Sequence, residues 1–197
     1  QEGKAFELGA KWQSADQRLN GSVALFDIRK TNVLTRSPTN ANYNVAAGEV
    51  RSRGLEADLA GQIDAHWRMT ANLAYTDAEV LRDNNPLLLG KRLMNVPRLS
   101  AGLFAIREDR LASGGRWGVG GGLVHVGERT GTATDTYRLP AYTTARLTSY
   151  WQIDKRTRLT LDVHNLFDKT YYTASWGNLT VIPGLGRHVV AGVQVAF

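Results

Sequence analysis

The chain has 197 residues, with 24 lysines and arginines against 18 acids, no cysteine and a mean hydropathy of −0.29. This length suits one substantial domain, and the sequence lacks the run of about 18 apolar residues that a transmembrane helix needs. The absence of cysteine excludes disulfides and thiolate metal sites.

Apolar residues that recur at every second position predict about nine strands. In chain order they are expected at residues 6–12, 19–34, 50–59, 67–75, 99–107, 117–126, 142–153, 159–163 and 189–197. Twenty glycines and only five prolines suit many short strands joined by tight turns. The sequence therefore predicts an all-β fold, an antiparallel meander of about nine strands.

The connections between these strands alternate between short and long. Short turns are expected at 14–17, 61–66, 108–115 and 154–157, and long connections at 35–44, 82–97, 127–140 and 166–187. In an antiparallel meander all short turns then lie at one end of the sheet. Outer-membrane barrels show this asymmetry, with short periplasmic turns and longer extracellular loops. Soluble lipocalin-like barrels also meander, but they bury their apolar face inside and stop at about eight strands.

Four tryptophans stand beside the short turns, at Trp12, Trp67, Trp117 and Trp151. Aromatic residues at one level suggest an interfacial girdle. The alternative is that tryptophan is simply common at strand ends.

The last predicted strand carries its apolar residues on one face. They are Val189, Ala191, Val193, Val195 and Phe197. In a membrane barrel these residues would face lipid while the strand closes against the first one. The pattern also resembles the C-terminal signal that directs outer-membrane proteins to the barrel-assembly machinery, which is therefore an expected partner. The alternative is an ordinary strand of a β-sandwich.

An odd number of strands does not form a standard single-chain bacterial barrel. Nine strands would also leave two open edges in hydrocarbon, where unpaired backbone groups are costly. We therefore expect the chain to be the C-terminal piece of a larger barrel.

Five segments, in order along the chain, carry a family resemblance. They are SRGLEA at 52–57, GKRLMNVPR at 90–98, LPAYT at 139–143, NLFDKTYY at 165–172 and the terminal strand ending in Phe197. With them the chain resembles the C-terminal third of TonB-dependent outer-membrane receptors, especially siderophore receptors. The resemblance implies that residues 1–197 form the C-terminal segment of a large plugged barrel, of the 22-stranded kind. The N-terminal plug and the earlier strands are absent from this sequence.

The resemblance also implies a function. The whole receptor would sit in the bacterial outer membrane as a multi-pass β-barrel and take up ferric siderophores by energy-coupled transport. Energy would come from TonB, acting through the absent N-terminal region with its TonB box. Ferric iron in a siderophore complex would be the cargo, with no cofactor bound directly. Haem and cobalamin remain alternative cargoes, and a passive porin-like or structural barrel is the main rival function.

Three of the matching segments have a structural interpretation of their own. Asn165 and Asp168 have side chains that can hydrogen-bond local backbone where a strand ends. Pro97 fixes φ and forces an extended residue before it as the next strand begins. Gly54 lies within a strand, where glycine permits a bulge or a tight bend. These motifs indicate architecture and do not name a ligand.

No motif for catalysis or metal binding stands out, so we expect neither a catalytic nor a metal site. The four histidines, His66, His125, His164 and His188, are scattered and have no cysteine partner. The glycines at 114–122 lack a following Gly-Lys-Ser/Thr and are interpreted as strand residues that allow curvature or close packing. A Ser/His/Asp site assembled from separate strands, as in an outer-membrane lipase or protease, remains an open but weaker alternative.

The excess of positive charge is spread along the chain, which argues against nucleic-acid binding. Arg146, Arg158 and Asp162 alternate with apolar neighbours, as lumen-facing residues would. Basic residues in the outer loops could contact outer-membrane lipid and the phosphates of lipopolysaccharide, or steer an anionic chelate.

The best candidates for ligand contact lie in the last two long loops. They are Arg129, Tyr137, Tyr171, Tyr172 and Trp176. Aromatic and arginine side chains suit a compact, charged chelate. As an alternative, Tyr171 and Tyr172 could continue a strand and belong to the outer aromatic girdle.

Overall fold

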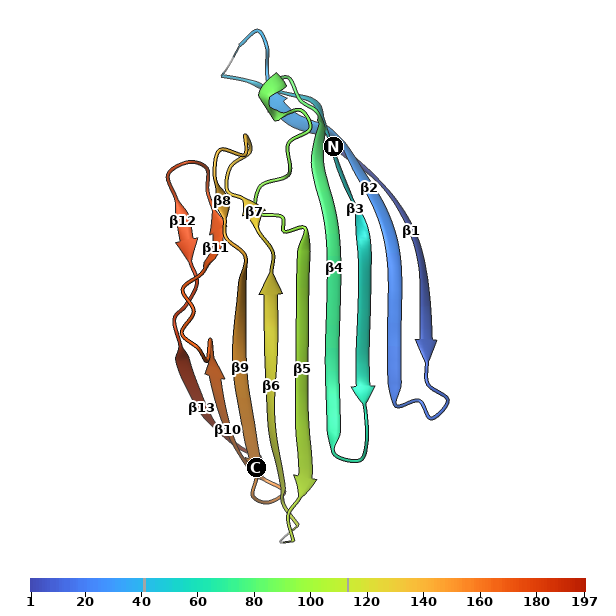
Figure 1. Ribbon diagram of the computed structural model, residues 1–197, viewed down its shortest axis with the longest axis vertical. Coiled ribbons are helices and arrows are strands. Elements are labelled where there is room, and N and C mark those ends of the chain that lie inside the picture. Colours follow the sequence, from blue (N-terminus) through green and yellow to red (C-terminus); the bar gives the residue numbers. More distant parts are fainter. Residues whose placement is uncertain (41, 113) are drawn as a thin grey trace.

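The main sheet contains nine strands, each hydrogen-bonded to the next along the chain. The computed structural model describes residues 1–40, 42–112 and 114–197. Its antiparallel sheet has the order β1-β2-β3-β4-β5-β6-β9-β10-β13 (Figure 1). The predicted all-β meander is confirmed. Ala41 and Ser113, within the predicted connections 35–44 and 108–115, lie outside the described residues.

Short turns and long loops alternate at the two ends of the sheet, as the sequence predicts. The strands of the main sheet are β1 (Glu2–Gln13), β2 (Leu19–Arg36), β3 (Asn44–Gln62), β4 (Trp67–Arg82), β5 (Leu99–Arg110), β6 (Arg116–Val126), β9 (Tyr142–Gln152), β10 (Thr157–His164) and β13 (His188–Val195). Smaller elements in the long loops are η1 (Pro86–Leu88), the pair β7 (Arg129–Thr130) and β8 (Arg138–Leu139), and the pair β11 (Tyr172–Ser175) and β12 (Val181–Pro183). In the described ranges, no helix has the length and apolar character needed to cross a membrane.

Several strands differ in length from the prediction. The hairpin of β2 and β3 pairs as far as Arg36 with Asn44, through polar residues that the sequence assigned to a loop. The strands can continue there because backbone hydrogen bonds between strands do not require apolar side chains beyond the apolar part of the sheet. At the other end of the chain, β13 stops at Val195, two residues before its predicted end at Phe197.

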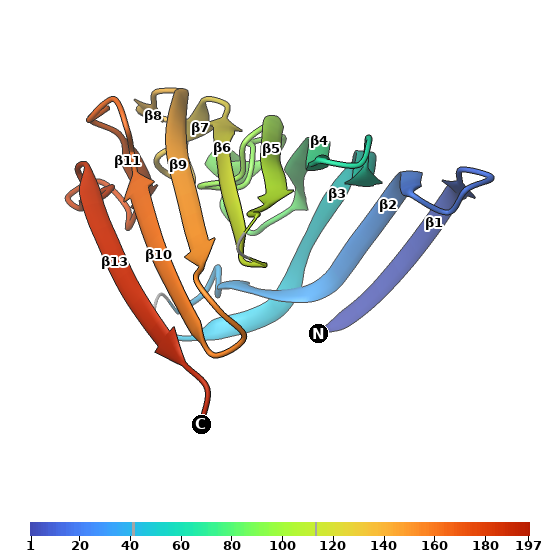
Figure 2. The ribbon, with the colours of Figure 1, turned by 90° about the horizontal axis from the view of Figure 1, so that it is seen from below.

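The sheet bends into an open arc with β1 and β13 at its two ends (Figure 2). Strand register divides its side chains into an outer, apolar face and an inner, polar face. One outer row joins Leu25, Leu55, Tyr75 and Leu99 on four successive strands. Leu25, Tyr75 and Leu99 are exposed, Leu25 at 52%, and Leu55 is half-buried. The isolated sheet therefore presents an uncovered apolar belt.

The four tryptophans lie on this outer face beside the short turns, as predicted. Trp117 and Trp151 are directly opposite each other on β6 and β9. Trp12 and Trp151 are each 50% exposed. Their common position marks one border of the apolar belt, where amphipathic rings are favoured at a membrane interface.

Glycines on the inner face of β6 allow large neighbouring side chains to lie across that strand. A Cβ atom at Gly118 would lie 2.3 Å from the ring of Tyr150, and one at Gly122 would lie 3.1 Å from the ring of Phe104. The predicted role of these glycines in close packing is confirmed.

Gly54 lies within β3, as predicted, but there is no bulge at this position. The register of β3 continues unbroken through Gly54 with both neighbouring strands. The register shifts lie elsewhere, at Thr31/Val33 and Val33/Leu34 in the β2–β3 pair and at Glu49/Val50 in the β3–β4 pair. A Cβ atom at Gly54 would lie 2.0 Å from the Tyr75 carbonyl oxygen. Close backbone approach is therefore the reason for glycine here.

Candidate functional site

The long loops at one end of the sheet are joined into one unit by buried polar groups. Asn95, in the loop between β4 and β5, accepts hydrogen bonds from the Ser175 backbone amide at 2.9 Å and from its hydroxyl at 3.0 Å. The Asn95 amide donates in return to the Ser175 carbonyl at 2.9 Å. Ser175 is fully buried, and its hydroxyl also lies 2.6 Å from the Gly131 carbonyl oxygen. Three loops distant in sequence thus meet at Ser175.

Arg129, a predicted ligand residue, belongs to this internal network. It is only 3% exposed and donates to the carbonyl oxygens of Tyr172 at 2.6 Å and Thr173 at 2.7 Å. Its guanidinium also lies over the Tyr142 ring, 5.4 Å from the centroid. The head group is therefore already bound by the loops, although its Nε has no partner among the described residues.

Tyr137, the second predicted residue in this loop, is similarly bound. Its hydroxyl donates to the Gly177 carbonyl oxygen at 2.8 Å, and its ring covers Gly131. Both side chains connect loop 127–141 to loop 165–187. They fix the positions of the remaining candidates.

Tyr171, Tyr172 and Trp176 are the predicted residues with accessible surface. Tyr171 packs against Tyr142 with ring centroids 4.5 Å apart. Tyr172 opens β11 and is 38% exposed, whereas Trp176 follows this strand and is 76% exposed. Strand β10 ends at His164 and Tyr172 begins β11, so neither tyrosine lies on a strand of the main sheet.

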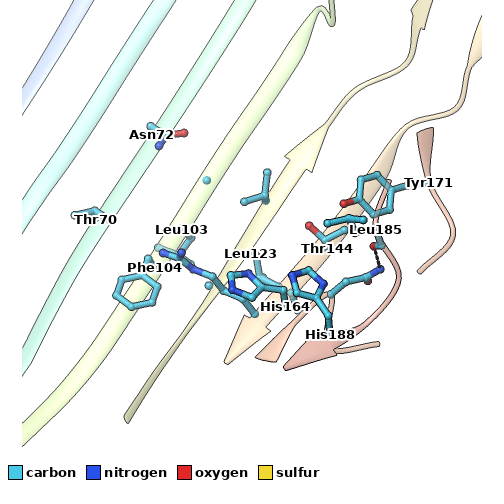
Figure 3. A pocket seen from close by; sticks show the side chains of 16 residues that line it. Thr70, Asn72, Leu103, Phe104, Leu123, Thr144, His164, Tyr171, Leu185 and His188 are labelled. Carbon is cyan, nitrogen blue, oxygen red and sulfur yellow. Dashed lines mark hydrogen bonds between the residues drawn. The ribbon is translucent and has the colours of Figure 1, made fainter. Parts of the chain in front are cut away.

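The inner face below these loops is hollowed by a cavity of about 400 Å³. Figure 3 shows side chains from several strands and from the last loop around it. Its lining includes Phe104, Arg146, His164, Tyr171 and His188. This is the candidate functional site.

Two side-chain pairs give the cavity its character. The rings of His164 and His188 are stacked, 4.8 Å apart and 10° from parallel. The His188 Nδ1 lies 3.0 Å from the Gly186 carbonyl oxygen, so this nitrogen acts as the donor and Nε2 remains available. Arg146 lies over the Phe104 ring at 4.5 Å. Aromatic faces, imidazoles and a guanidinium together suit a compact polar anion.

The sequence alone did not predict that His164, His188 and Arg146 lie around the same cavity. His164 and His188 are 24 positions apart in the chain, and they are neighbours because β10 and β13 pair directly. Two-residue periodicity placed Arg146 on the polar face but gave no partner for it. No group of three or more metal-ligating side chains occurs among the residues that the structure describes.

Several arginines of the long loops lie close to one another. Burial lowers the pKa of Arg92, and the nearby Arg98 and Arg138 add repulsion in the same direction. A hydrogen bond from Thr130 and the charge of Arg138 lower the pKa of Asp135. Arg138 also pairs with Glu128 at 2.6 Å, so the loop region holds several guanidinium groups with carboxylates among them.

An apolar outer face bordered by tryptophans, a polar inner face and unequal connections define the wall of a membrane-spanning β-barrel. Residues 1–166 match the family described as "TonB dependent receptor-like, beta-barrel". The chain belongs to this family and is an outer-membrane protein.

Two curated relatives and one solved structure illustrate the similarity. The metal-pseudopaline receptor CntO of Pseudomonas aeruginosa is 37% identical over the whole of this chain and 28% of its own length. The ferrichrome outer membrane transporter/phage receptor of Escherichia coli is 27% identical over 99% of this chain and 26% of its own. The crystal structure of the siderophore receptor PiuA from Acinetobacter baumannii superposes with a TM-score of 0.87 at 26% identity, covering 98% of this chain and 28% of that one. The chain thus spans just over a quarter of these proteins, which are transport receptors.

Proposed function

We propose that this chain forms the C-terminal part of the barrel of a receptor that takes up ferric siderophores. Membership of the receptor family across most of the chain is the observation that carries the proposal. The names of the relatives refer to metal–pseudopaline, ferrichrome and siderophores, all of them metal chelates or their carriers. The cavity is lined by an arginine, two histidines and aromatic rings, which suit the binding of a compact anionic chelate.

In the proposed mechanism the cargo binds at the long-loop end and moves inward with energy supplied by TonB. A plug and a TonB-binding segment, encoded before residue 1, would receive that energy. Tyr171 and the exposed Trp176 offer flat faces to the chelate, while Arg129 and Tyr137 hold the loops that carry them. The protein's role is binding and transport, with no covalent step.

The outward residues of β13 are proposed to have a second role. Val189, Ala191, Val193 and Val195 form an apolar stripe, followed by Phe197. We propose that this stripe is the signal read by the barrel-assembly machinery.

Uptake of ⁵⁵Fe-labelled siderophores by cells that carry or lack the gene tests the function. We expect uptake of at least one chelate to depend on the gene and to stop when TonB is deleted or the membrane is de-energised. Gene-dependent uptake that continues without TonB would favour the passive porin-like barrel. Haem and cobalamin, assayed in parallel, separate the alternative cargoes.

A further inference from the structure

The outer face carries a charged patch directly above the apolar belt, on the long-loop side. Above the row of Leu25, Leu55 and Tyr75, the next outward positions on the same strands are Asp27, Arg53 and Asp77. The row beyond pairs Arg29 with Arg51, and Arg51 with Glu79. On each of these three adjacent strands, the outward side chains change from apolar to charged between one outward position and the next.

Two carboxylates in this patch each hold two arginines. Glu49 lies 2.7 Å from the Arg82 guanidinium and 4.0 Å from that of Arg29. The bulge between Glu49 and Val50 brings Arg82 opposite Glu49 and so onto the outer face.

Asp77 repeats this arrangement on the neighbouring strand. It lies 3.3 Å from the Arg53 guanidinium and 3.6 Å from that of Arg98. A further pair, Arg51 with Asp27, is bidentate. We call Arg29, Arg51, Arg53, Arg82 and Arg98 the arginine ladder.

Four of the five arginines are more exposed than the carboxylates beneath them; the exception is Arg51, at 22% against 33% for its partner Asp27. The side chains of Arg53 and Arg82 are 50% and 68% exposed, whereas those of Glu49 and Asp77 are 14% and 24% exposed. Arg29 and Arg98 are also about half exposed, at 51% and 54%. Five guanidiniums face four carboxylates, Asp27, Glu49, Asp77 and Glu79, so the patch retains a net positive charge, and its exposed guanidiniums keep N–H donors directed outward.

The position of the ladder selects its partner. The ladder continues the apolar belt without a gap, so whatever lies against it is continuous with the lipid that covers the belt. Guanidinium groups bind phosphate through paired N–H donors, and the half-buried carboxylates hold these groups in place in advance. We propose that the arginine ladder binds the phosphates of a phosphorylated glycolipid in the outer leaflet. This proposal is independent of the cargo.

The test is native mass spectrometry of the full-length protein, titrated with bis-phosphorylated lipid A. The variant R53Q/R82Q removes one arginine from each carboxylate. The matched control is R18Q/R107Q, which removes two arginines that are 56% and 50% exposed and paired with aspartates at the short-turn end. We expect about tenfold weaker lipid A binding in R53Q/R82Q and no change in the control, because each basic residue near a charged membrane surface contributes to attraction.

Additional lipids and variants separate phosphate recognition from the effect of net charge. Dephosphorylated lipid A should bind wild type and R53Q/R82Q equally, and R53K/R82K should recover part of the lost binding because it keeps the charge. Heat-modifiable migration of each variant checks that the barrel is folded. Equal loss in R18Q/R107Q would overturn the proposal in favour of net charge. Unchanged binding in R53Q/R82Q, equally tight phosphatidylglycerol binding, or a second copy of the protein in place of lipid would also overturn it.

Discussion

At the residue scale, asparagines and aspartates stabilise the points where strands end. Asn165 donates to the carbonyl oxygens of Lys169 and Leu185 and accepts from the Lys169 amide. Asp168 accepts from the Arg187 amide at 2.8 Å. Both residues have positive φ, which asparagine and aspartate tolerate better than most residues. The predicted local role is confirmed for Asn165 by its bonds to Lys169, whereas Asp168 binds the Arg187 amide, 19 positions further along the chain.

Asn95 acts over a longer distance, which the sequence did not indicate. Its φ of 65° is left-handed, and its side chain joins two loops through Ser175. Asn95→Gly keeps the backbone conformation but removes the side chain. We expect a loss of about 1–3 kcal/mol in the stability of the loop unit, because the buried Ser175 groups lose their partner.

Limited proteolysis within residues 165–187 measures this effect. We expect faster cleavage in Asn95→Gly than in wild type. As a control, Asn178→Gly changes an exposed asparagine in the last loop. Equal cleavage of Asn95→Gly and wild type would show that the hydrogen bonds between Asn95 and Ser175 do not order the loops.

Gly118 provides a second test at this scale. Gly118→Ala places a methyl group against the Tyr150 ring, which is held by a hydrogen bond to Glu108 and by Arg158 at 3.9 Å. We expect a decrease of about 1–3 kcal/mol in the free energy of unfolding, typical of overpacking. Urea unfolding followed by tryptophan fluorescence measures it. Gly3→Ala, where the added atom meets nothing within 4 Å, is expected to be neutral.

At the scale of elements, two-residue periodicity predicted which face of each strand is apolar, but not the full strand lengths. In β10, Leu161 lies on the outer face and Thr160 on the inner face. The alternation is local and therefore readable from the sequence. The ends of β2 and β3 depend on pairing between strands, so their polar extensions were predicted as loop.

Replacing outer and inner neighbours in β10 tests the face assignment. Leu161→Arg places a charge in lipid, and we expect it to cost about 2–4 kcal/mol if it lies near the bilayer midplane. Thr160→Arg places the same charge on the polar inner face and should cost much less. Unfolding in liposomes compares the two. A larger cost for Thr160→Arg would reverse the assignment of faces.

The short turns are stabilised by aspartates whose charged form is favoured in the folded state. Backbone amides of His66 and Trp67 lower the pKa of Asp64, and those of Arg156 and Thr157 lower the pKa of Asp154. A lowered folded-state pKa contributes stability above the unfolded value of about 3.9, and this contribution is lost as pH falls through the folded pKa.

We therefore expect Asp64→Ala and Asp154→Ala to be less stable than wild type at pH 7. The difference should shrink as the pH falls below about 3.9, because the carboxylates of the unfolded chain bind protons there before those of the folded protein, and it is lost as the pH falls through the lowered folded-state pKa. Urea midpoints at pH 7 and pH 3 measure it. A difference that is the same at both pH values would mean that the carboxylate charge has no role.

At the scale of the whole molecule, this chain forms an open arc, which we propose to be part of a larger barrel wall. The sheet has two open edges, on β1 and β13, and few apolar side chains are buried within the described ranges: Ala78, Leu139 and Ala145. A sheet with an uncovered apolar belt and two unpaired edges is incompatible with lipid unless further strands complete it. This agrees with the chain spanning 28% of CntO.

An antibody to residues 188–195 tests whether the protein is longer. In outer membranes we expect a heat-modifiable band more than three times the 21.7 kDa of this chain, in line with the length of its relatives. The band should shift on boiling because a closed barrel resists unfolding by detergent. A band near 22 kDa would contradict the proposal that this chain is part of a larger receptor.

The sequence by itself determined the strand periodicity, the alternation of turns and loops, the tryptophan border and the family, since each depends on residues close together in the chain. Only the tertiary structure decided what the loop residues do. Arg129 and Tyr137 have the composition of ligand contacts, yet both bind backbone carbonyls of a loop about 40 residues away. The cavity with His164, His188 and Arg146, and the arginine ladder outside, arise from pairing between strands. Such pairing is not encoded by local periodicity, because register fixes neighbours only once the whole sheet has formed.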